Sequence, residues 1–327
     1  MITVAILEDI HNALIDYPAI QQLRQRVNLR VHTRAMTTDE RSTLLKGTEV
    51  VVGLRERTRF DTAFLDDAPD LKLIIQTGRV GPNLDMDAIT KRGVLVAQAA
   101  GAGGPAGGAN STVELTVGLI IAIMRRIPQA DALMRRGQWV VLPYGRALAG
   151  KTLGVIGPGR IGSWVAKIGV MFGMKVLTWS RNITQERAAA LGATAAASLD
   201  ELMRDSDVVT VHLPLNQSTR NLISAEKLDL LRPTAYFVNT SRGPIADEDH
   251  LVTLLQARRI AGAALDVYNR EPLPVGHALL ALDNVVLTPH IGWPADSGYS
   301  GFAEGVASVV NAYLDGKLEP VNPEARR

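Results

Sequence analysis

A glycine-rich turn between two apolar stretches constrains this chain more than any other feature. Leu153–Ile156 is typical of a short buried strand, and Lys175–Trp179 of a second one. An amphipathic stretch from about Arg160 lies between them, so the segment reads as strand, turn, helix and strand. The turn carries three glycines with the spacing G-x-G-x-x-G: Gly157, Gly159 and Gly162.

Each of these glycines has a physical role in a turn that binds a dinucleotide. Gly157 allows the sharp turn, Gly159 lets the backbone approach a pyrophosphate, and Gly162 lets the helix pack closely on the strand. The free N–H groups and the positive dipole end of the helix would hold the phosphates. The surrounding strands and helix favour a dinucleotide-binding βαβ unit over a merely structural glycine turn.

Composition narrows the class of protein. The 327 residues suggest two domains, and 46% apolar content is ample for two cores. The 35 basic and 33 acidic residues nearly balance, with no basic stripe interleaved with aromatic residues, so we expect no nucleic-acid partner. The absence of cysteine excludes disulfides and thiolate chemistry, and we expect no metal. The chain shows neither a signal peptide nor an apolar run that could span a membrane, which favours a cytoplasmic protein.

The first 100 residues alternate between strand and helix patterns, which predicts a parallel sheet covered by helices. The predicted strands are Thr3–Leu7, Leu29–His32, Val50–Leu54, Leu71–Gln76 and Val94–Ala97. The predicted helices are Tyr17–Arg26, Thr38–Leu45 and Asp61–Ala68. No glycine fingerprint opens this region, so we do not expect it to hold the cofactor.

Residues 101–108, with the sequence GAGGPAGG, are suited to a hinge or crossover. Asn110 or Ser111 is expected to cap a long helix that ends near Arg126, and a second helix follows at about Gln129–Arg136. The alternation then resumes, and the last helix, at about Ala295–Asp315, is expected to return to the first domain. Further strands are predicted at Val208–Leu213, Ala235–Asn239, Gly262–Val267 and Val285–Thr288, and further helices at Gln185–Leu191, Leu199–Arg204, Ala225–Leu230 and Glu248–Ala257.

The predicted fold class is therefore α/β, with two doubly wound parallel-sheet domains. A Rossmann cofactor domain at 101–290, with six or seven strands, is inserted in a flavodoxin-like substrate domain made of 1–100 and 291–327. In such sheets ligands bind at the carboxyl ends of the strands. Three predicted strands end with reactive side chains there: Arg242 after the first, Asp266 and Glu271 after the second, and His290 after the third.

Five motifs in order along the chain resemble those of the D-2-hydroxyacid dehydrogenase family, which includes glyoxylate/hydroxypyruvate reductases and phosphoglycerate dehydrogenases. They are GVIGPGRIG, VVTVHLPLNQSTRNLI, FVNTSRGPIADEDHL, ALDVYNREPLP and TPHIG. The resemblance implies catalytic roles for Arg242, Glu271 and His290. The residue types agree: a planar cation anchors a carboxylate, and imidazole gives a proton. Glu271 would hold the second imidazole nitrogen, and a nicotinamide cofactor supplies the hydride.

The resemblance also implies a set of binding contacts. Arg160 and Ile161 would present N–H groups to the pyrophosphate, and Thr240 and Asp266 would touch the nicotinamide end. Leu213, Pro214 and Thr219 would line the adenosine side, although Thr219 and His212 could equally be turn and strand-end structure. The substrate carboxylate would meet Arg79, Val80 and Gly81, where Arg79 and Pro82 depart from the commoner Gly-Val-Gly-Val-Asp pattern. Trp293 is either a pocket wall or a core aromatic residue.

The end of the second strand of the fingerprint unit bears on the cofactor. Fingerprints specific for NAD place an Asp or Glu about 20 residues beyond the glycines. Here Ser180 stands at that position and Arg181 follows it, with no carboxylate adjacent. A hydroxyl and a guanidinium can bind a 2′-phosphate, so NADP is favoured over NAD, although dual specificity follows if Arg181 points to solvent.

The leading hypothesis is an NAD(P)-dependent oxidoreductase that acts on small 2-keto or 2-hydroxy acids, of glyoxylate/hydroxypyruvate reductase type. The alternative is a non-enzymatic protein of the same fold that senses NAD(P)(H). A formate dehydrogenase is set aside, because that enzyme has Gln where this chain has Glu271. By resemblance the protein is a homodimer joined through the cofactor domain, with contacts near Glu114–Arg136.

Overall fold

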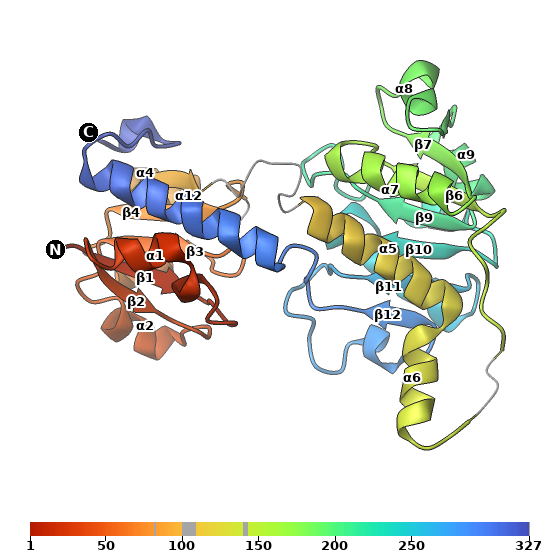
Figure 1. Cartoon of the computed structure of the whole chain (residues 1–327), viewed down its shortest axis with the longest axis horizontal. Coiled ribbons are helices and arrows are strands. Elements are labelled where there is room, and N and C mark those ends of the chain that lie inside the picture. Colours follow the sequence, from red (N-terminus) through yellow and green to blue (C-terminus); the bar gives the residue numbers. More distant parts are fainter. Residues whose placement is uncertain (82, 100–108, 140–142, 327) are drawn as a thin grey trace. The chain divides into compact units, whose positions relative to one another are not determined.

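The computed structural model describes residues 1–81, 83–99, 109–139 and 143–326 (Figure 1). The chain folds into two compact units, each with most of its contacts within itself. Unit 1 comprises Met1–Gly108 and Pro294–Arg327, and unit 2 comprises Ala109–Trp293. The second unit is thus inserted into the first, as predicted, while the exact sequence-based boundaries stay a prediction. The glycine-rich segment 101–108 that we expected to form a hinge lies outside the described residues.

Within the described part of unit 1, five strands form one parallel sheet in the order β2-β1-β3-β4-β5, which is the flavodoxin-like order. The strands are β1 (Thr3–Leu7), β2 (Asn28–Val31), β3 (Val50–Gly53), β4 (Leu73–Thr77) and β5 (Leu95–Ala99). The helices are η1 (Leu14–Asp16), α1 (Pro18–Leu23), α2 (Thr38–Leu44), α3 (Thr62–Asp67) and α4 (Met86–Lys91). Runs such as Val50–Gly53 are buried at every position because helices cover both faces of a parallel sheet.

The C-terminal segment completes unit 1. Helix α12 (Asp296–Leu314) packs on α1, β4 and β5, and the short helix η4 (Pro323–Arg326) follows it (Figure 1). The buried Asn322 side chain accepts the N–H of Val96 at 2.7 Å and donates to the carbonyl of Val94 at 3.0 Å. The first and last parts of the sequence therefore share one core.

In the described residues of unit 2, seven parallel strands run in the order β12-β11-β10-β9-β6-β7-β8. This is the Rossmann order with one additional strand at the β12 edge. The strands are β6 (Thr152–Ile156), β7 (Lys175–Trp179), β8 (Thr194–Ala195), β9 (Val208–Val211), β10 (Tyr236–Asn239), β11 (Gly262–Leu265) and β12 (Val285–Leu287). The strand order reverses at β6, because β7 and β8 are added on one side of β6 and β9 on the other. The glycine turn begins at the end of β6.

Alternate residues of the central strands pack into two hydrophobic cores, one on each face of the sheet. Leu153 and Val155 face a cluster with α5 and α7, which lie side by side in Figure 1, whereas Ile156 joins the cluster on the other face. The helices of unit 2 are α5 (Ala109–Arg125), α6 (Ile127–Arg135), α7 (Arg160–Met171), α8 (Gln185–Ala189), α9 (Leu199–Asp205), α10 (Ala225–Leu228), η2 (Gly243–Ile245), α11 (Glu248–Gln256) and η3 (Ala278–Ala281). In the part of the chain that the structure describes, no helix combines the length and apolarity needed to cross a membrane.

The two-sheet α/β fold is confirmed, with three local corrections. The sequence reading missed α4 and the two-residue strand β8, both of which are short. The expected cap at Asn110 or Ser111 is wrong, because α5 already begins at Ala109. The Ser111 hydroxyl instead donates to the carbonyl oxygen of Gly292 at 3.0 Å, so a tertiary contact takes the place of the expected cap.

Candidate active site

The three candidate catalytic residues follow three neighbouring strands. Strands β10, β11 and β12 are adjacent and in register, so that Asn239 pairs with Leu265 and Leu265 with Leu287. The loops that leave these strand ends carry Arg242, Glu271 and His290, one residue each. The residues predicted from three separated motifs are therefore on loops at the same edge of the sheet, where ligands bind in open parallel sheets.

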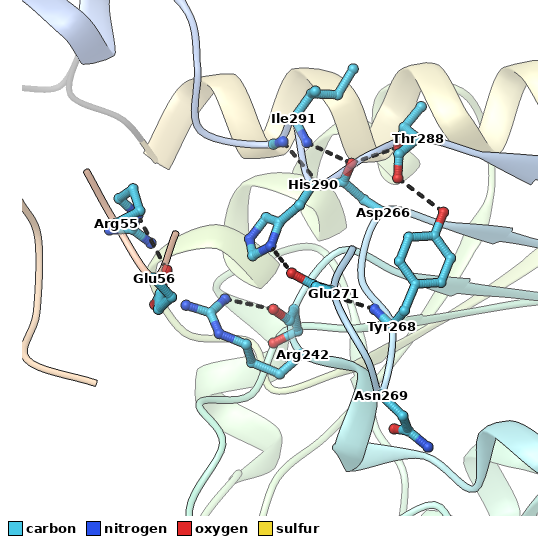
Figure 2. Close-up of polar contacts among 12 residues, drawn as sticks. Arg55, Glu56, Arg242, Asp266, Tyr268, Asn269, Glu271, Thr288, His290 and Ile291 are labelled. Atoms are coloured by element: carbon cyan, nitrogen blue, oxygen red, sulfur yellow. Dashed lines mark hydrogen bonds and ion pairs between the residues drawn. The ribbon is translucent and has the colours of Figure 1, made fainter. Parts of the chain in front are cut away.

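Glu271 and His290 form a direct pair. The Nδ1 atom of His290 lies 2.6 Å from the Oε2 atom of Glu271 (Figure 2). The other carboxylate oxygen, Oε1, accepts the backbone N–H of Tyr268 at 2.9 Å. Both oxygens of Glu271 are thereby held, so the imidazole is fixed through Nδ1 and its Nε2 atom is left to face a ligand.

Asp266 braces the turn that carries His290. Its Oδ1 atom accepts the Thr288 hydroxyl at 2.6 Å and the Ile291 N–H at 2.8 Å, and its Oδ2 atom accepts the Gly292 N–H at 2.9 Å (Figure 2). Burial raises the pKa of the Asp266 carboxyl, and these three donors and nearby His290 act in the opposite direction. The donors surround His290, whose backbone is left-handed at φ +54°. Whether Asp266 also contacts the nicotinamide stays a prediction.

Tyr268 joins the strand ends to the catalytic loop. Its hydroxyl lies 2.9 Å from the carbonyl oxygen of Thr288 and 3.1 Å from that of Leu265, and it can donate to either. Burial raises the pKa of the Tyr268 phenol well above its ordinary value, so the group stays a neutral donor. Because its N–H holds Glu271, Tyr268 connects β11, β12 and the carboxylate that orients His290. Sequence reasoning missed this residue.

Arg242 is placed by the turn after β10. The Asn239 side chain donates to the carbonyl oxygen of Arg242 at 3.1 Å, and the Arg242 guanidinium donates to the Ser241 carbonyl at 2.6 Å. The next residue, Gly243, meets the Glu271 loop directly: a Cβ built there would lie 2.1 Å from the carbonyl carbon of Tyr268. Only glycine allows this approach, and it joins the Arg242 turn to the loop that carries Glu271.

The glycine fingerprint has the geometry that a pyrophosphate requires. Gly157 is left-handed at φ +86°, and a Cβ at Gly162 would lie 2.3 Å from the Gly157 carbonyl oxygen, so helix and strand touch. Apart from the adjacent residues, no heavy atom of the protein lies within 4 Å of the Cβ position at Gly159, and no side chain caps the helix that starts at Arg160. The turn thus offers open space beside free N–H groups, including that of Ile161, which fits a dinucleotide phosphate.

The predicted adenosine side lies in two loops. Ser180 and Arg181 follow β7, and the Arg181 guanidinium donates to the carbonyl oxygen of Ser218 at 2.5 Å. Thr219 is buried; its hydroxyl donates to the Pro214 carbonyl at 2.6 Å and accepts the Asn216 N–H at 2.9 Å. These contacts are those of turn structure. Leu213, the residue before Pro214, accepts the Ser241 hydroxyl through its carbonyl.

His212 also has contacts that belong to the fold. Its Nε2 atom lies 3.0 Å from the Thr210 hydroxyl, and burial lowers the pKa of the imidazole to about 3. The ring is therefore neutral at physiological pH. Thr240, which we expected at the nicotinamide end, shares a 2.8 Å hydrogen bond with Thr116 of α5. These contacts leave the ligand roles of both side chains as predictions.

The remaining predicted substrate residues lie in unit 1. Arg79, Val80 and Gly81 follow Gly78, the first residue after β4, which is left-handed at φ +82°. Their part in substrate binding stays a prediction, as does that of Trp293, whose carbonyl accepts the Ser111 hydroxyl at 3.5 Å. Across the described ranges, no three His, Asp or Glu side chains cluster in a way that could hold a metal ion.

Known proteins share this sequence and architecture. The family model described as "D-isomer specific 2-hydroxyacid dehydrogenase, NAD binding domain" matches residues 117–292. A glyoxylate reductase of Thermofilum pendens is 37% identical over an alignment of 327 positions, which covers 95% of this chain and 93% of that protein. A D-3-phosphoglycerate dehydrogenase of Methanocaldococcus jannaschii is 35% identical over 319 residues, covering 97% of this chain and 58% of that protein.

A solved structure agrees over nearly the whole chain. The phosphoglycerate oxidoreductase of Vibrio cholerae superposes with a TM-score of 0.89 at 34% identity, covering 97% of this chain and all of that one. The two relatives and the solved structure cover nearly the whole chain. The family model lies within unit 2, and its range contains the glycine fingerprint and the strand ends described above. The chain belongs to the D-isomer specific 2-hydroxyacid dehydrogenase family, and it is a nicotinamide-dependent oxidoreductase that acts on CH–OH donors.

Proposed function

We propose that this enzyme works mainly as a reductase of a small 2-keto acid, of glyoxylate or hydroxypyruvate type, with NADPH as the favoured cofactor. The observation that carries the proposal is the 2.6 Å pair between His290 Nδ1 and Glu271 Oε2 at the carboxyl edge of the cofactor-binding sheet. Imidazole held in this way by a carboxylate is suited to give a proton to a developing alkoxide. The glyoxylate reductase of Thermofilum pendens supports the substrate class.

The roles of the three side chains follow from their chemistry. Arg242 binds the carboxylate of the keto acid, because guanidinium is permanently charged and pairs with both oxygens of a carboxylate. His290 donates a proton from Nε2 to the carbonyl oxygen. Glu271 keeps the ring oriented, since its carboxylate lies 2.6 Å from Nδ1. The bound cofactor supplies the hydride.

The preference for NADPH rests on the end of β7. Ser180 stands where NAD-specific fingerprints have a carboxylate, which would repel a 2′-phosphate. Arg181 follows it and already reaches the loop after β9 through the Ser218 carbonyl, so its charge is held on the predicted adenosine side. Both residues would therefore contact the 2′-phosphate.

We also propose that the enzyme is a homodimer through unit 2. Within the described residues, α6 buries none of its side chains, and Ile127 and Met134 are 50% and 53% exposed. On α7, Trp164 and Met171 are 50% and 83% exposed. An apolar surface of this kind on a folded chain is typical of a protein interface. The predicted contact near Glu114–Arg136 includes the first of these patches.

A panel of 2-keto acids of increasing size, each with NADPH and with NADH, tests the function. We expect turnover of glyoxylate or hydroxypyruvate well above that of a His290→Ala variant. Turnover of larger keto acids alone would overturn the proposed substrate class. Binding of NADPH without turnover of any keto acid above the His290→Ala control would instead favour a protein that only senses the dinucleotide.

A further inference from the structure

The backbone on both sides of the Tyr268 Cα atom is held by other groups. The N–H of Tyr268, which belongs to the Val267–Tyr268 peptide, donates to Glu271 Oε1. The next peptide, between Tyr268 and Asn269, donates its N–H to Oε2 of Glu248 at 2.9 Å. Gly243 packs on that second peptide, since a Cβ there would lie 2.3 Å from the Tyr268 carbonyl oxygen. A shift of the Tyr268–Asn269 peptide would therefore displace Tyr268, whose own N–H fixes the Glu271 carboxylate.

Glu248 is the side chain that reaches this peptide from outside the loop. It is the first residue of α11, and it is only 8% exposed. Its Oε1 atom lies 3.7 Å from Nε2 of His277, a residue near the far end of the same loop. The Leu279 N–H donates to His277 Nδ1 at 3.3 Å, so the ring proton sits on Nε2 and faces Glu248. One buried carboxylate thus contacts the loop on both sides of Glu271.

The charges around Glu248 are few. Burial raises the pKa of its carboxyl, the Asn269 N–H and His277 act in the opposite direction, and Asp249 and Glu271 add to the increase. Asp249 belongs to the same helix, whereas His277 and Glu271 face Glu248 from the loop. The position at the N-terminus of α11 also favours a carboxylate.

We propose that Glu248 is a positioning residue for the Glu271–His290 pair. It holds the N–H of Asn269, the adjacent N–H of Tyr268 holds Glu271, and Glu271 orients the imidazole. The inference rests on the proposed roles of Glu271 and His290 in reduction. Glu248 itself touches neither substrate nor cofactor in this role.

The test is the pH profile of reduction with the best keto acid for the wild type, Glu248→Ala, Glu248→Gln and Glu271→Gln. Glu248→Ala removes the acceptor of the Asn269 N–H, so the backbone that places the Tyr268 N–H against Glu271 is held less firmly. We expect kcat to fall roughly tenfold, because small displacements of reacting groups are costly, with KM little changed. The pH profile of kcat/KM should change in the same way as that of Glu271→Gln. Glu248→Gln keeps an oxygen for the Asn269 N–H and should restore the profile.

Glu201 gives the matched control, because its carboxylate also accepts a backbone N–H near a helix start, that of Ala197 at 2.6 Å. Glu201→Ala should leave the profile unchanged. A Glu248→Ala enzyme with a lower melting temperature but a wild-type profile would overturn the positioning role. If Glu248→Ala does not fold, Glu248→Asp, which withdraws the carboxylate by one methylene, must show the same shift. An unshifted Glu271→Gln profile would overturn the pairing itself, and the positioning role with it.

Discussion

The imidazole of His290 and the carboxylate of Glu271 meet at 2.6 Å although their loops leave different strands of the sheet. Two further contacts fix the positions of these side chains. Asp266 accepts the backbone N–H of Ile291, the residue after His290, and the Tyr268 N–H donates to the second carboxylate oxygen of Glu271. The pair is thus oriented from both ends, and the predictions below depend on that orientation.

Removal of His290 and removal of Arg242 should impair catalysis in different ways. Loss of general acid catalysis in His290→Ala should reduce kcat by about 10²–10⁴. Arg242→Ala should also raise KM strongly, because binding of the substrate carboxylate is lost. Steady-state kinetics with the best keto acid measure both effects. Arg232→Ala, at an exposed pair with Asp205, is the control, and near wild-type turnover of both site variants would show that the site is assigned wrongly.

Glu271→Gln should change the pH dependence of reduction. The amide keeps the size of the side chain but removes the charge that faces Nδ1 of His290 at 2.6 Å. We therefore expect kcat to fall and the pH profile of kcat/KM to differ from that of the wild type. Rates measured from pH 5 to pH 10 in one buffer series give this profile. A superimposable profile would count against the pairing in solution.

Cofactor preference should depend on the two residues after β7. A charge-assisted hydrogen bond to the 2′-phosphate is worth roughly 1.5–3 kcal/mol, or about ten- to over a hundredfold in affinity. We therefore expect Arg181→Ala to lose most of the preference for NADPH, and Ser180→Asp to reverse it by repulsion. The measurement is kcat/KM for each cofactor with one substrate. The idea fails if the wild type prefers NADH or if Ser180→Asp still prefers NADPH.

Substitutions at two glycines of the fingerprint should have different effects, one on stability and the other on cofactor binding. Gly162→Ala places a Cβ 2.3 Å from a backbone oxygen, so the melting temperature should fall. The Cβ of Gly159→Ala meets no protein atom within 4 Å beyond the adjacent residues, so the melting temperature should be unchanged while the added methyl obstructs the pyrophosphate. Calorimetry and cofactor titration of both variants test this contrast. Full cofactor affinity in Gly159→Ala would place the pyrophosphate elsewhere.

The proposed dimer should depend on the exposed apolar side chains of unit 2. Charged substitutions at Met134 and Met171 would each bury a charge without a partner in an interface, which is costly. We expect Met134→Glu with Met171→Glu to shift the protein from dimer to monomer in size-exclusion chromatography with light scattering. Val275→Glu, at a fully exposed apolar side chain, is the control. A monomeric wild type would contradict the proposal directly.

The sequence predicted most of the fold because buried parallel strands are continuous apolar runs. Strand β1 was predicted with its observed bounds, as was β7. Strand β8 has only two residues, too few for any periodicity to show. Ser111 was assigned as a cap from local chemistry, yet its hydroxyl bonds to Gly292, which lies 181 positions away in the sequence.

The candidate site divides in a similar way. Arg242, Glu271 and His290 could be proposed as catalytic because each follows a predicted strand and lies in a motif that resembles those of the dehydrogenase family. Tyr268 and Glu248 were not, because their contacts involve backbone N–H and carbonyl groups. The Tyr268 hydroxyl reaches the Thr288 carbonyl, and the Glu248 carboxylate reaches the Asn269 N–H. Spacing along the chain does not reveal which backbone group a buried carboxylate will accept.

The insertion of unit 2 into unit 1 also sets the order in which the protein can fold during synthesis. The core of unit 2 lies in one continuous run, so it can close as soon as Trp293 has emerged. Unit 1 must wait for α12, whose buried Val306 and Val310 belong to the helix that covers β4 and β5. Domains generally fold as units while the chain is made. The part translated first is therefore completed last, and its sheet needs protection from aggregation for the whole time that the cofactor unit is being synthesised.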